Sequence, residues 1–330
     1  MGTHSPEPGP IGPHHAGRLV KIGQQSQQEL RRHLGWQGLR WSIGPFIIHL
    51  RAKVPNFPQF LHTFYGENLL LSPPWDDIAD FHLTLHPPLG LRRFWRPKVH
   101  FRLDGNAFFT PFPLDHAPPL FEWGLNMAIA SRSNHYLLFH AAVLEKNGNA
   151  LMLPGTPGAG KSTLCAALML RGFRLLSDEF GLYCPQQKRF LANPRPIGLK
   201  NESIDIIRAF DSQAILSQEF PNTRKGTVCY LQPSAESVHN AHNGATPTWI
   251  VFPSFQESQP TYLETLPQAT SFLRLAANAF NYETMGATGF ECVHAMIQSC
   301  SVMQLRFGRL EEALSQLHTL TQSTQPTVHT

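Results

Sequence analysis

The sequence predicts an α/β fold for residues 136–330, preceded by an α+β domain over residues 18–135. Two observations lead to this prediction. Apolar segments of strand length alternate with segments of helical periodicity through the second part of the chain, which is the order typical of α/β sheets. In addition, the run Gly155-Thr156-Pro157-Gly158-Ala159-Gly160-Lys161-Ser162 matches the phosphate-binding pattern G-x-x-x-x-G-K-[ST] in full, and it stands between an apolar strand and a helix.

The N-terminal part of the chain is less regular. Residues 1–17 are rich in Pro, Gly and His and offer almost nothing to bury, so we expect a disordered tail. Apolar and alternating patterns then predict strands over residues 43–50, 81–85 and 99–103 and helices over residues 58–66 and 120–133. The segment Arg92–Lys98 mixes cations with aromatic rings, which is typical of an amphipathic surface edge or, alternatively, of a substrate-docking patch or a nucleic-acid contact.

The second part is a regular series of predicted elements. Its first strand covers residues 136–144, and the Asn147-Gly148 turn returns the chain as the strand 150–153. The helix after the phosphate-binding loop closes at Gly172. The remaining patterns predict strands over residues 173–177, 180–184, 227–231, 248–252 and 301–306 and helices over residues 203–210, 267–279 and 284–298.

Composition narrows the functional classes. The 330 residues are 42% apolar, enough for a sizeable core, and the net charge of +4 is too weak to indicate nucleic-acid binding. The five cysteines form no C-x-x-C pair, which predicts free thiols in a reducing cytoplasm. No apolar stretch reaches about 18 residues and the N-terminus lacks a secretory pattern, so we expect a cytoplasmic protein without membrane insertion. The 17 histidines lack the clustered spacing of a zinc site.

The phosphate-binding loop is the strongest chemical signal in the chain. Its glycines let backbone N–H groups converge on the phosphates of a nucleotide. Lys161 adds a positive charge toward the β- and γ-phosphates, the Ser162 hydroxyl is a ligand for Mg²⁺, and Thr163 continues the nucleotide-binding run into the helix. The alternative is a glycine-rich turn with a surface lysine, which the strand-loop-helix context disfavours.

An acidic pair, Asp178-Glu179, directly follows the next predicted strand. Ligands of such sheets bind at the carboxyl ends of the strands, so we expect the pair to lie beside the loop. One carboxylate is then placed to accept a hydroxyl proton and the other to hold Mg²⁺, the alternative being a turn acid without a catalytic role. His140 lies in an apolar strand, where a histidine is more often a packed core residue than a functional one.

The stretch from His140 to Glu179 resembles the catalytic core of the HPr kinase/phosphorylase family. The family series is a His-Gly strand, a P-loop, an Arg-Gly pair and a short strand ending in two acids, and its counterparts here are His140-Ala141, Gly155–Ser162, Arg171-Gly172 and Leu175–Glu179. The resemblance implies a P-loop kinase core of the HPr kinase/phosphoenolpyruvate carboxykinase type, with ATP or GTP and Mg²⁺. It also implies that Asp178 is the base for the substrate hydroxyl and that His140 lies close to the transferred phosphoryl group.

A weaker similarity extends to about residue 231. Asn193–Leu199 is similar to the family's Glu-Ile-Arg-Gly segment, which assigns Arg195 to the phosphates, and Glu202 is the nearby acid that would replace the missing Glu as a metal ligand. Thr223–Gly226 looks like the family's Pro-Gly-Arg-Asn loop and offers Lys225 as another charge near the phosphates. The alternative for each of these three side chains is a solvated loop residue.

The chain also departs from the family. Glu179 stands in place of the second Asp and Ala141 in place of Gly, and the residues before 136 do not resemble the family's N-terminal domain. The whole sequence is more similar to the HPr kinase-related kinase A proteins, whose genes lie in exosortase-type protein-sorting clusters, and the lasso-peptide kinases are another divergent branch. Both likenesses imply a changed acceptor.

We therefore expect a bacterial Mg²⁺-dependent kinase that transfers the γ-phosphoryl group of ATP (or GTP) to a Ser/Thr-type hydroxyl of a protein or peptide. Lys161, with Arg195 or Lys225, would neutralise the charge that develops on the phosphoryl oxygens. The N-terminal domain is a candidate for docking the substrate or a partner, and the hexamers of the family imply a homo-oligomer. The alternative is a nucleotide-binding regulatory or assembly protein without phosphoryl transfer, and a plain hydrolase is a third hypothesis.

Overall fold

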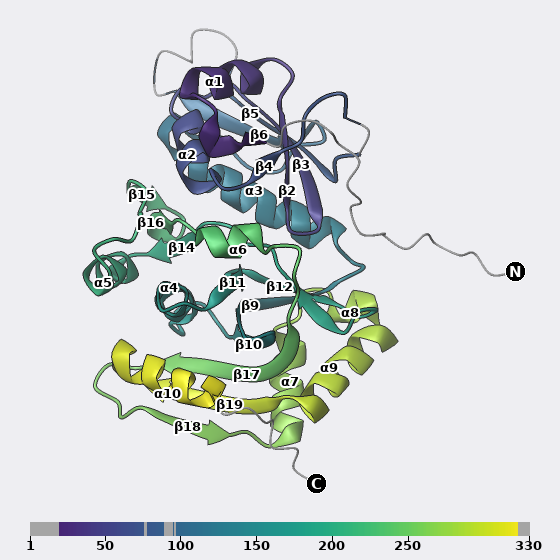
Figure 1. The fold of residues 1–330 in the computed structure, drawn as a ribbon, viewed down its shortest axis with the longest axis vertical. Helices are drawn as coiled ribbons and strands as arrows, with labels where there is room; N and C mark the ends of the chain where they lie inside the picture. The colour runs from purple at the N-terminus through teal and green to yellow at the C-terminus, as the bar shows by residue number, and fades with distance from the viewer. Residues whose placement is uncertain (1–19, 76–77, 89–94, 96, 323–330) are drawn as a thin grey trace, which may run out of the picture.

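The computed structural model of the protein describes residues 20–75, 78–88, 95 and 97–322 (Figure 1). The predicted tail and most of the segment Arg92–Lys98 lie outside these residues, so neither prediction is tested. The described chain contains parallel and antiparallel sheets together with helices, which agrees with the predicted mixed α/β content. None of the described helices is long and apolar enough to cross a membrane.

In its described residues, the N-terminal unit is an eight-stranded sheet with three α-helices. The strand order is β1-β4-β2-β3-β5-β6-β7, and β8 pairs with β6. The elements are β1 (Val20–Lys21), α1 (Gln27–Gly35), β2 (Leu39–Ile43), β3 (Phe46–Ala52), α2 (Phe57–Phe64), β4 (Leu69–Leu70), β5 (Phe81–His86), β6 (Lys98–Leu103), β7 (Asn106–Ala107), β8 (Phe112–Pro113) and α3 (Ala117–Arg132). Alternate residues are buried along β2, β3, β5 and β6, so one face of this sheet carries the core.

The predicted strand over residues 43–50 is wrong at its start, because the chain turns between β2 and β3. Gly44 begins this turn with φ +56°, in the left-handed region that favours glycine. A Cβ at Gly44 would lie 1.9 Å from the carbonyl oxygen of Ala192, which belongs to the second unit. The turn therefore reverses the chain and also touches the neighbouring unit.

We expect Gly44→Ala to destabilise the protein by about 2–3 kcal/mol, because the methyl group must displace the Ala192 backbone and the residue must also keep a strained φ. Gly105→Ala is the matched control, since Gly105 has φ +83° but a Cβ there meets no atom within 4 Å. Its expected cost is about 1 kcal/mol. Unfolding in urea gives the free energy of unfolding of both variants. Equal losses of stability in the two variants would contradict the steric role of Gly44.

The second unit is built on another eight-stranded sheet, ordered β13-β12-β9-β10-β17-β19-β18, with β11 also paired to β9. Its strands are β9 (Leu137–Lys146), β10 (Asn149–Pro154), β11 (Arg174–Ser177), β12 (Phe180–Cys184), β13 (Arg189–Leu191), β17 (Thr246–Phe255), β18 (Tyr262–Thr265) and β19 (Ser301–Phe307). β10, β17 and β19 are parallel neighbours, whereas β9 runs antiparallel to β10. The sheet is thus mixed, with β10, β17 and β19 as its parallel part.

Helices cover both faces of this second sheet (Figure 1). α4 (Lys161–Leu170) and α10 (Leu310–Gln322) share a hydrophobic cluster on one face. α7 (Gln268–Ala277), α8 (Tyr282–Met285) and α9 (Ala287–Ser299) pack on the other face. The strands between them are buried on both sides, which explains why they are continuous apolar runs in the sequence.

A three-stranded sheet lies between the two units (Figure 1). Its order is β14-β16-β15, and the elements around it are β14 (Ile197–Lys200), α5 (Glu202–Phe210), β15 (Phe220–Thr223), β16 (Gly226–Leu231) and α6 (Ala235–His239). Tyr230 of β16 belongs to the same hydrophobic cluster as the N-terminal sheet, and its ring centroid is 5.8 Å from that of Phe60. The two units therefore share part of their core.

Candidate active site

The loop predicted to bind phosphate joins β10 to α4, so the strand-loop-helix context predicted from the sequence is present. Thr156, Pro157 and Gly158 are exposed at its tip. Gly160 precedes the helix with φ +87°, and a Cβ there would lie 2.8 Å from the Phe307 ring. Only glycine suits both constraints, and the loop leaves the N-terminus of α4 open to an anion.

Lys161 is the first residue of α4 and folds back over the loop. Its Nζ donates hydrogen bonds to the carbonyl oxygens of Gly155 (2.6 Å) and Thr156 (3.1 Å). Burial lowers the pKa of Lys161, although the nearby Asp178 and Glu179 carboxylates oppose this shift. The ammonium is thus held beside the loop by two uncharged backbone oxygens.

The sheet topology brings the acidic pair to the same place. β11 runs antiparallel to β9, and hence in the direction of β10, so Asp178 and Glu179 leave the sheet at the edge from which the loop leaves. The Asp178 carboxylate accepts a hydrogen bond from the Gly198 N–H at 3.3 Å, and the Ser162 side chain lies close enough to lower its pKa. This contact joins the acidic pair to the loop.

The two acids have opposite pKa shifts. Burial, reinforced by the charge of Glu179, raises the pKa of Asp178 from 3.8 to about 6. Burial alone would also raise the pKa of Glu179, but Lys225 and Lys200 outweigh it and hold that pKa below its usual range. Neighbouring carboxyl groups whose pKa values are driven apart are typical of a division into a base and a permanently charged group.

His140 lies in β9 beside the acidic pair. Its Nε2 atom is 3.8 Å from Glu179 Oε2, and its ring centroid is 5.6 Å from that of Phe280. Burial, reinforced by the charge of Lys161, lowers the pKa of His140, so the imidazole is neutral at pH 7. The histidine of the apolar strand is therefore part of this site, with one face packed on an aromatic ring.

Two lysines bring positive charge to the acidic pair. Lys225, in the turn between β15 and β16, has its Nζ 3.7 Å from Glu179 Oε1 and 5.5 Å from the centre of the Trp123 ring. Lys200, at the end of β14, lies close enough to affect the pKa values of both acids. Lys200 was not predicted from the sequence. The only signal for it there is a cation that follows a short apolar run.

Arg195 belongs to a buried polar chain that reaches into the N-terminal unit. Tyr65 donates a hydrogen bond of 2.5 Å to Glu122 Oε1, and Arg195 Nη1 lies 3.3 Å from Glu122 Oε2. Arg195 Nη2 also donates to Asn126 Oδ1. The guanidinium, predicted to face the phosphates, is therefore held by a carboxylate and an amide behind the site.

A small cavity of about 30 Å³ separates this chain from Asp178. Three of the side chains that line it have buried polar atoms without a hydrogen-bond partner among the described residues: Asp178 Oδ1, both side-chain polar atoms of Asn193 and the Tyr230 hydroxyl. Buried polar groups are normally paired, so this cavity has the character of a binding site for a small polar group.

The residues present fit Mg²⁺ in part. The Ser162 hydroxyl and the carboxylates of Asp178 and Glu179 supply only oxygen atoms, which is the donor set that Mg²⁺ takes together with water. Glu202, the other predicted ligand, is exposed at the start of α5 and does not line the cavity. In the described part of the chain, no three His, Cys, Asp or Glu side chains are grouped to hold a metal ion.

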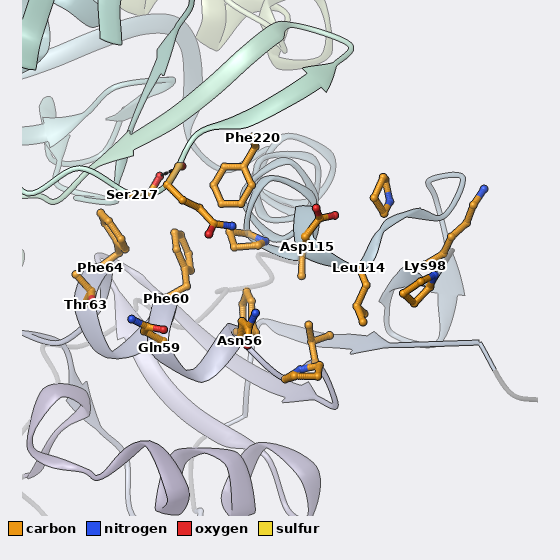
Figure 2. Close-up of a pocket in the computed structure, with 18 of the residues that line it drawn as sticks. Asn56, Gln59, Phe60, Thr63, Phe64, Lys98, Leu114, Asp115, Ser217 and Phe220 are labelled. Carbon is orange, nitrogen blue, oxygen red and sulfur yellow. Dashed lines mark hydrogen bonds between the residues drawn. The ribbon is translucent and has the colours of Figure 1, made fainter. Parts of the chain in front are cut away.

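A second cavity, of about 1010 Å³, opens where the two units meet (Figure 2). Phe60 and Phe64 of α2 form one wall, and Ser217 and Phe220 lie opposite them. The hairpin that carries Phe220 at this groove also carries Lys225 at the acidic pair. The groove and the site therefore share one structural element.

Comparisons with known proteins give a distant structural likeness and no match by sequence. No protein-family profile matches the chain, and no curated protein matches it at a significant level. Among the solved structures that match is the HPr(Ser) kinase/phosphatase from Coxiella burnetii, which is 13% identical over 56% of this chain and 97% of that chain, with a TM-score of 0.22. A likeness at this level assigns no role to any residue of this chain.

Proposed function

We propose that the protein is a Mg²⁺-dependent phosphotransferase that moves the γ-phosphoryl group of ATP or GTP to a Ser/Thr-type hydroxyl of a protein or peptide. The observation that carries this proposal is that the sheet places Asp178 at the edge from which the phosphate-binding loop leaves, close enough to Ser162 for the two side chains to interact. It places a carboxyl group with a pKa of about 6 beside the hydroxyl of the loop motif. A base of this strength at the phosphate end of the loop suits proton removal from an attacking hydroxyl.

In the proposed complex, the loop amides and Lys161 hold the triphosphate. The Lys161 ammonium exchanges the carbonyl oxygens of Gly155 and Thr156 for phosphate oxygens and stabilises the charge of the transition state. Mg²⁺, when bound, neutralises the β- and γ-phosphates, and Ser162 and Glu179 are the residues proposed to hold it.

Asp178 is the proposed base. With a pKa of about 6 it is mostly ionised at pH 7, yet it binds a proton more strongly than an ordinary aspartate of pKa 3.8. Its Oδ1 atom is buried and has no hydrogen-bond partner in the described part of the chain, so it can accept the substrate hydroxyl once the small cavity beside it opens. His140 stays neutral beside it and adds no charge that would lower this basicity.

The outer residues have less defined roles. Lys225 and Lys200 are proposed to stabilise the transferred phosphoryl oxygens, because both place positive charge near Glu179. Arg195 is occupied by Glu122 and Asn126, and Glu202 is exposed. The roles predicted for these last two residues at the phosphates and the metal therefore rest on the family resemblance alone.

The proposal is tested with ATP that is labelled at the γ-phosphate and with a peptide library. Each peptide of the library contains one serine or threonine, and the transfer of label to the peptides is measured. We expect label on this library and none on a matched alanine library. Lys161→Ala should lower the transfer rate at least about 100-fold, because the charge on the phosphates is lost. Lys53→Ala, which removes an exposed lysine of the N-terminal unit, is the control and should retain the wild-type rate.

A nucleotide-binding regulatory protein without transfer is the second candidate function. The observation that favours it is that Asp178 is buried and the cavity beside it holds only about 30 Å³, which leaves little room for an acceptor side chain. Tight ATP binding with no labelled peptide would support this candidate. Release of labelled phosphate to water alone would identify a hydrolase.

A further inference from the structure

The phosphate-binding loop has two flanks in the sheet. β10, which leads into the loop, pairs with antiparallel β9 on one side and with parallel β17 on the other. Asp178 follows β11, which pairs with β9, so the acidic pair lies on the β9 flank. If a triphosphate lies in the loop with its γ end toward Asp178, its ribose and base point to the opposite flank, where β17 ends.

β17 ends in an exposed aromatic ring at the edge of the loop. A Cβ on Gly160 would lie 3.4 Å from Cβ of Phe255, and a Cβ on Gly155 would lie 3.8 Å from Cδ of Pro253. Phe255 is 45% exposed, although it pairs across the sheet with Phe307, which is only 3% exposed. Their ring centroids are 5.5 Å apart, so a buried ring supports the exposed one.

The chain after Phe255 is held against β19. The Gln256 N–H donates to the Phe307 carbonyl oxygen at 3.0 Å, and the Gln259 N–H donates to the Gln256 carbonyl oxygen at 3.2 Å. A Cβ on Gly308 would lie 2.7 Å from the Gln259 nitrogen, so this segment also packs closely on the end of β19. The backbone that carries Phe255 is thus held in place before a ligand binds, which reduces the entropic cost of binding.

We propose that Phe255 is the platform on which the base of the nucleotide stacks. The inference rests on the proposed function, because it takes the triphosphate to lie in the loop with its γ end at Asp178. Stacking uses the aromatic face that every nucleobase has, so it needs no hydrogen-bonding motif in the sequence. It follows that ATP and GTP bind with similar affinities.

Calorimetry with two probes tests this assignment, using ATP, which has a base, and tripolyphosphate, which has none. Phe255→Ala removes the ring, and Phe255→Leu also keeps an apolar side chain over Phe307. For both variants we expect ATP to bind roughly 5- to 100-fold more weakly and tripolyphosphate to bind as it does to the wild type. Phe255→Trp should bind ATP at least as tightly as the wild type, and ATP, but not tripolyphosphate, should quench the added indole fluorescence.

Phe108→Ala is the matched control, because Phe108 is a comparably exposed phenylalanine in the N-terminal unit, and it should change neither affinity. Unchanged ATP affinity in both Phe255 variants would overturn the inference. If the binding of ATP and of tripolyphosphate were weakened equally, the inference would also be overturned, because the ring would then have a structural role. Failure of the wild type to bind either probe would instead overturn the proposed function, so the two failures are distinct.

Discussion

Asp178→Asn is expected to abolish phosphoryl transfer and also to make the protein more stable at pH 7. An amide cannot accept the proton of the acceptor hydroxyl, so the transfer rate should fall at least about 100-fold. ATP binding should persist, because Lys161 and the loop are unchanged. The gain in stability has a separate cause, which is the removal of a buried carboxylate that burial and Glu179 disfavour.

The pH dependence of this gain has a defined sign. The folded protein holds the proton of Asp178 more tightly than the unfolded chain, because the pKa is raised from 3.8 to about 6. The wild type therefore loses stability as the pH rises between these values, and above about pH 6 the full penalty of about 2–3 kcal/mol is present. The variant carries no such penalty, so the two proteins should differ little below about pH 4.

Urea unfolding in metal-free buffer at pH 4 and pH 7, together with the peptide transfer assay, measures both effects. Asp205→Asn is the control, because the Asp205 side chain is 81% exposed and its loss should change stability by less than about 0.5 kcal/mol. A variant less stable than the wild type at pH 7 would contradict the burial argument. A variant that still transfers phosphate would contradict the assignment of the base.

Arg195→Met is expected to destabilise the protein by about 3–5 kcal/mol. The change leaves the Glu122 carboxylate buried without its cation, and burial already raises the pKa of Glu122. The double variant with Glu122→Gln should recover most of this loss, because the unpaired charge is then gone. Chemical denaturation of the two single variants and the double variant gives the interaction energy of the pair.

Arg208→Met is the matched control for Arg195→Met. Arg208 also pairs with two acceptors, Asp205 and Glu219, but all three side chains are largely exposed, so the expected loss is below about 1 kcal/mol. If Arg195→Met kept wild-type stability and lost only transfer, Arg195 would act at the phosphates, as predicted from the sequence. Equal losses for Arg195→Met and Arg208→Met would contradict the buried network.

Local patterns were sufficient for the elements around the loop. β10, α4 and β11 lie close to their predicted ranges, because an apolar run and a helical period are properties of adjacent residues. α1 goes unpredicted although Ser26 and Glu29 form a capping box, a signal that is present in the sequence. α10 also goes unpredicted, although its buried residues lie at helical spacing. The two-residue strands β4, β7 and β8 are too short to show a pattern in the sequence.

The loop at 155–163 and the pair Asp178-Glu179 can be read from the sequence, because glycine conformation and a strand that ends in acids depend on neighbours along the chain. The raised pKa of Asp178 cannot be read in this way, since it results from burial by residues of several elements. The same holds for Arg195, whose partner Glu122 is 73 residues away. Lys200 and Phe255 also meet the loop only when distant strands come together at one edge of the molecule, and pairing over such separations is set by the packing of the whole core.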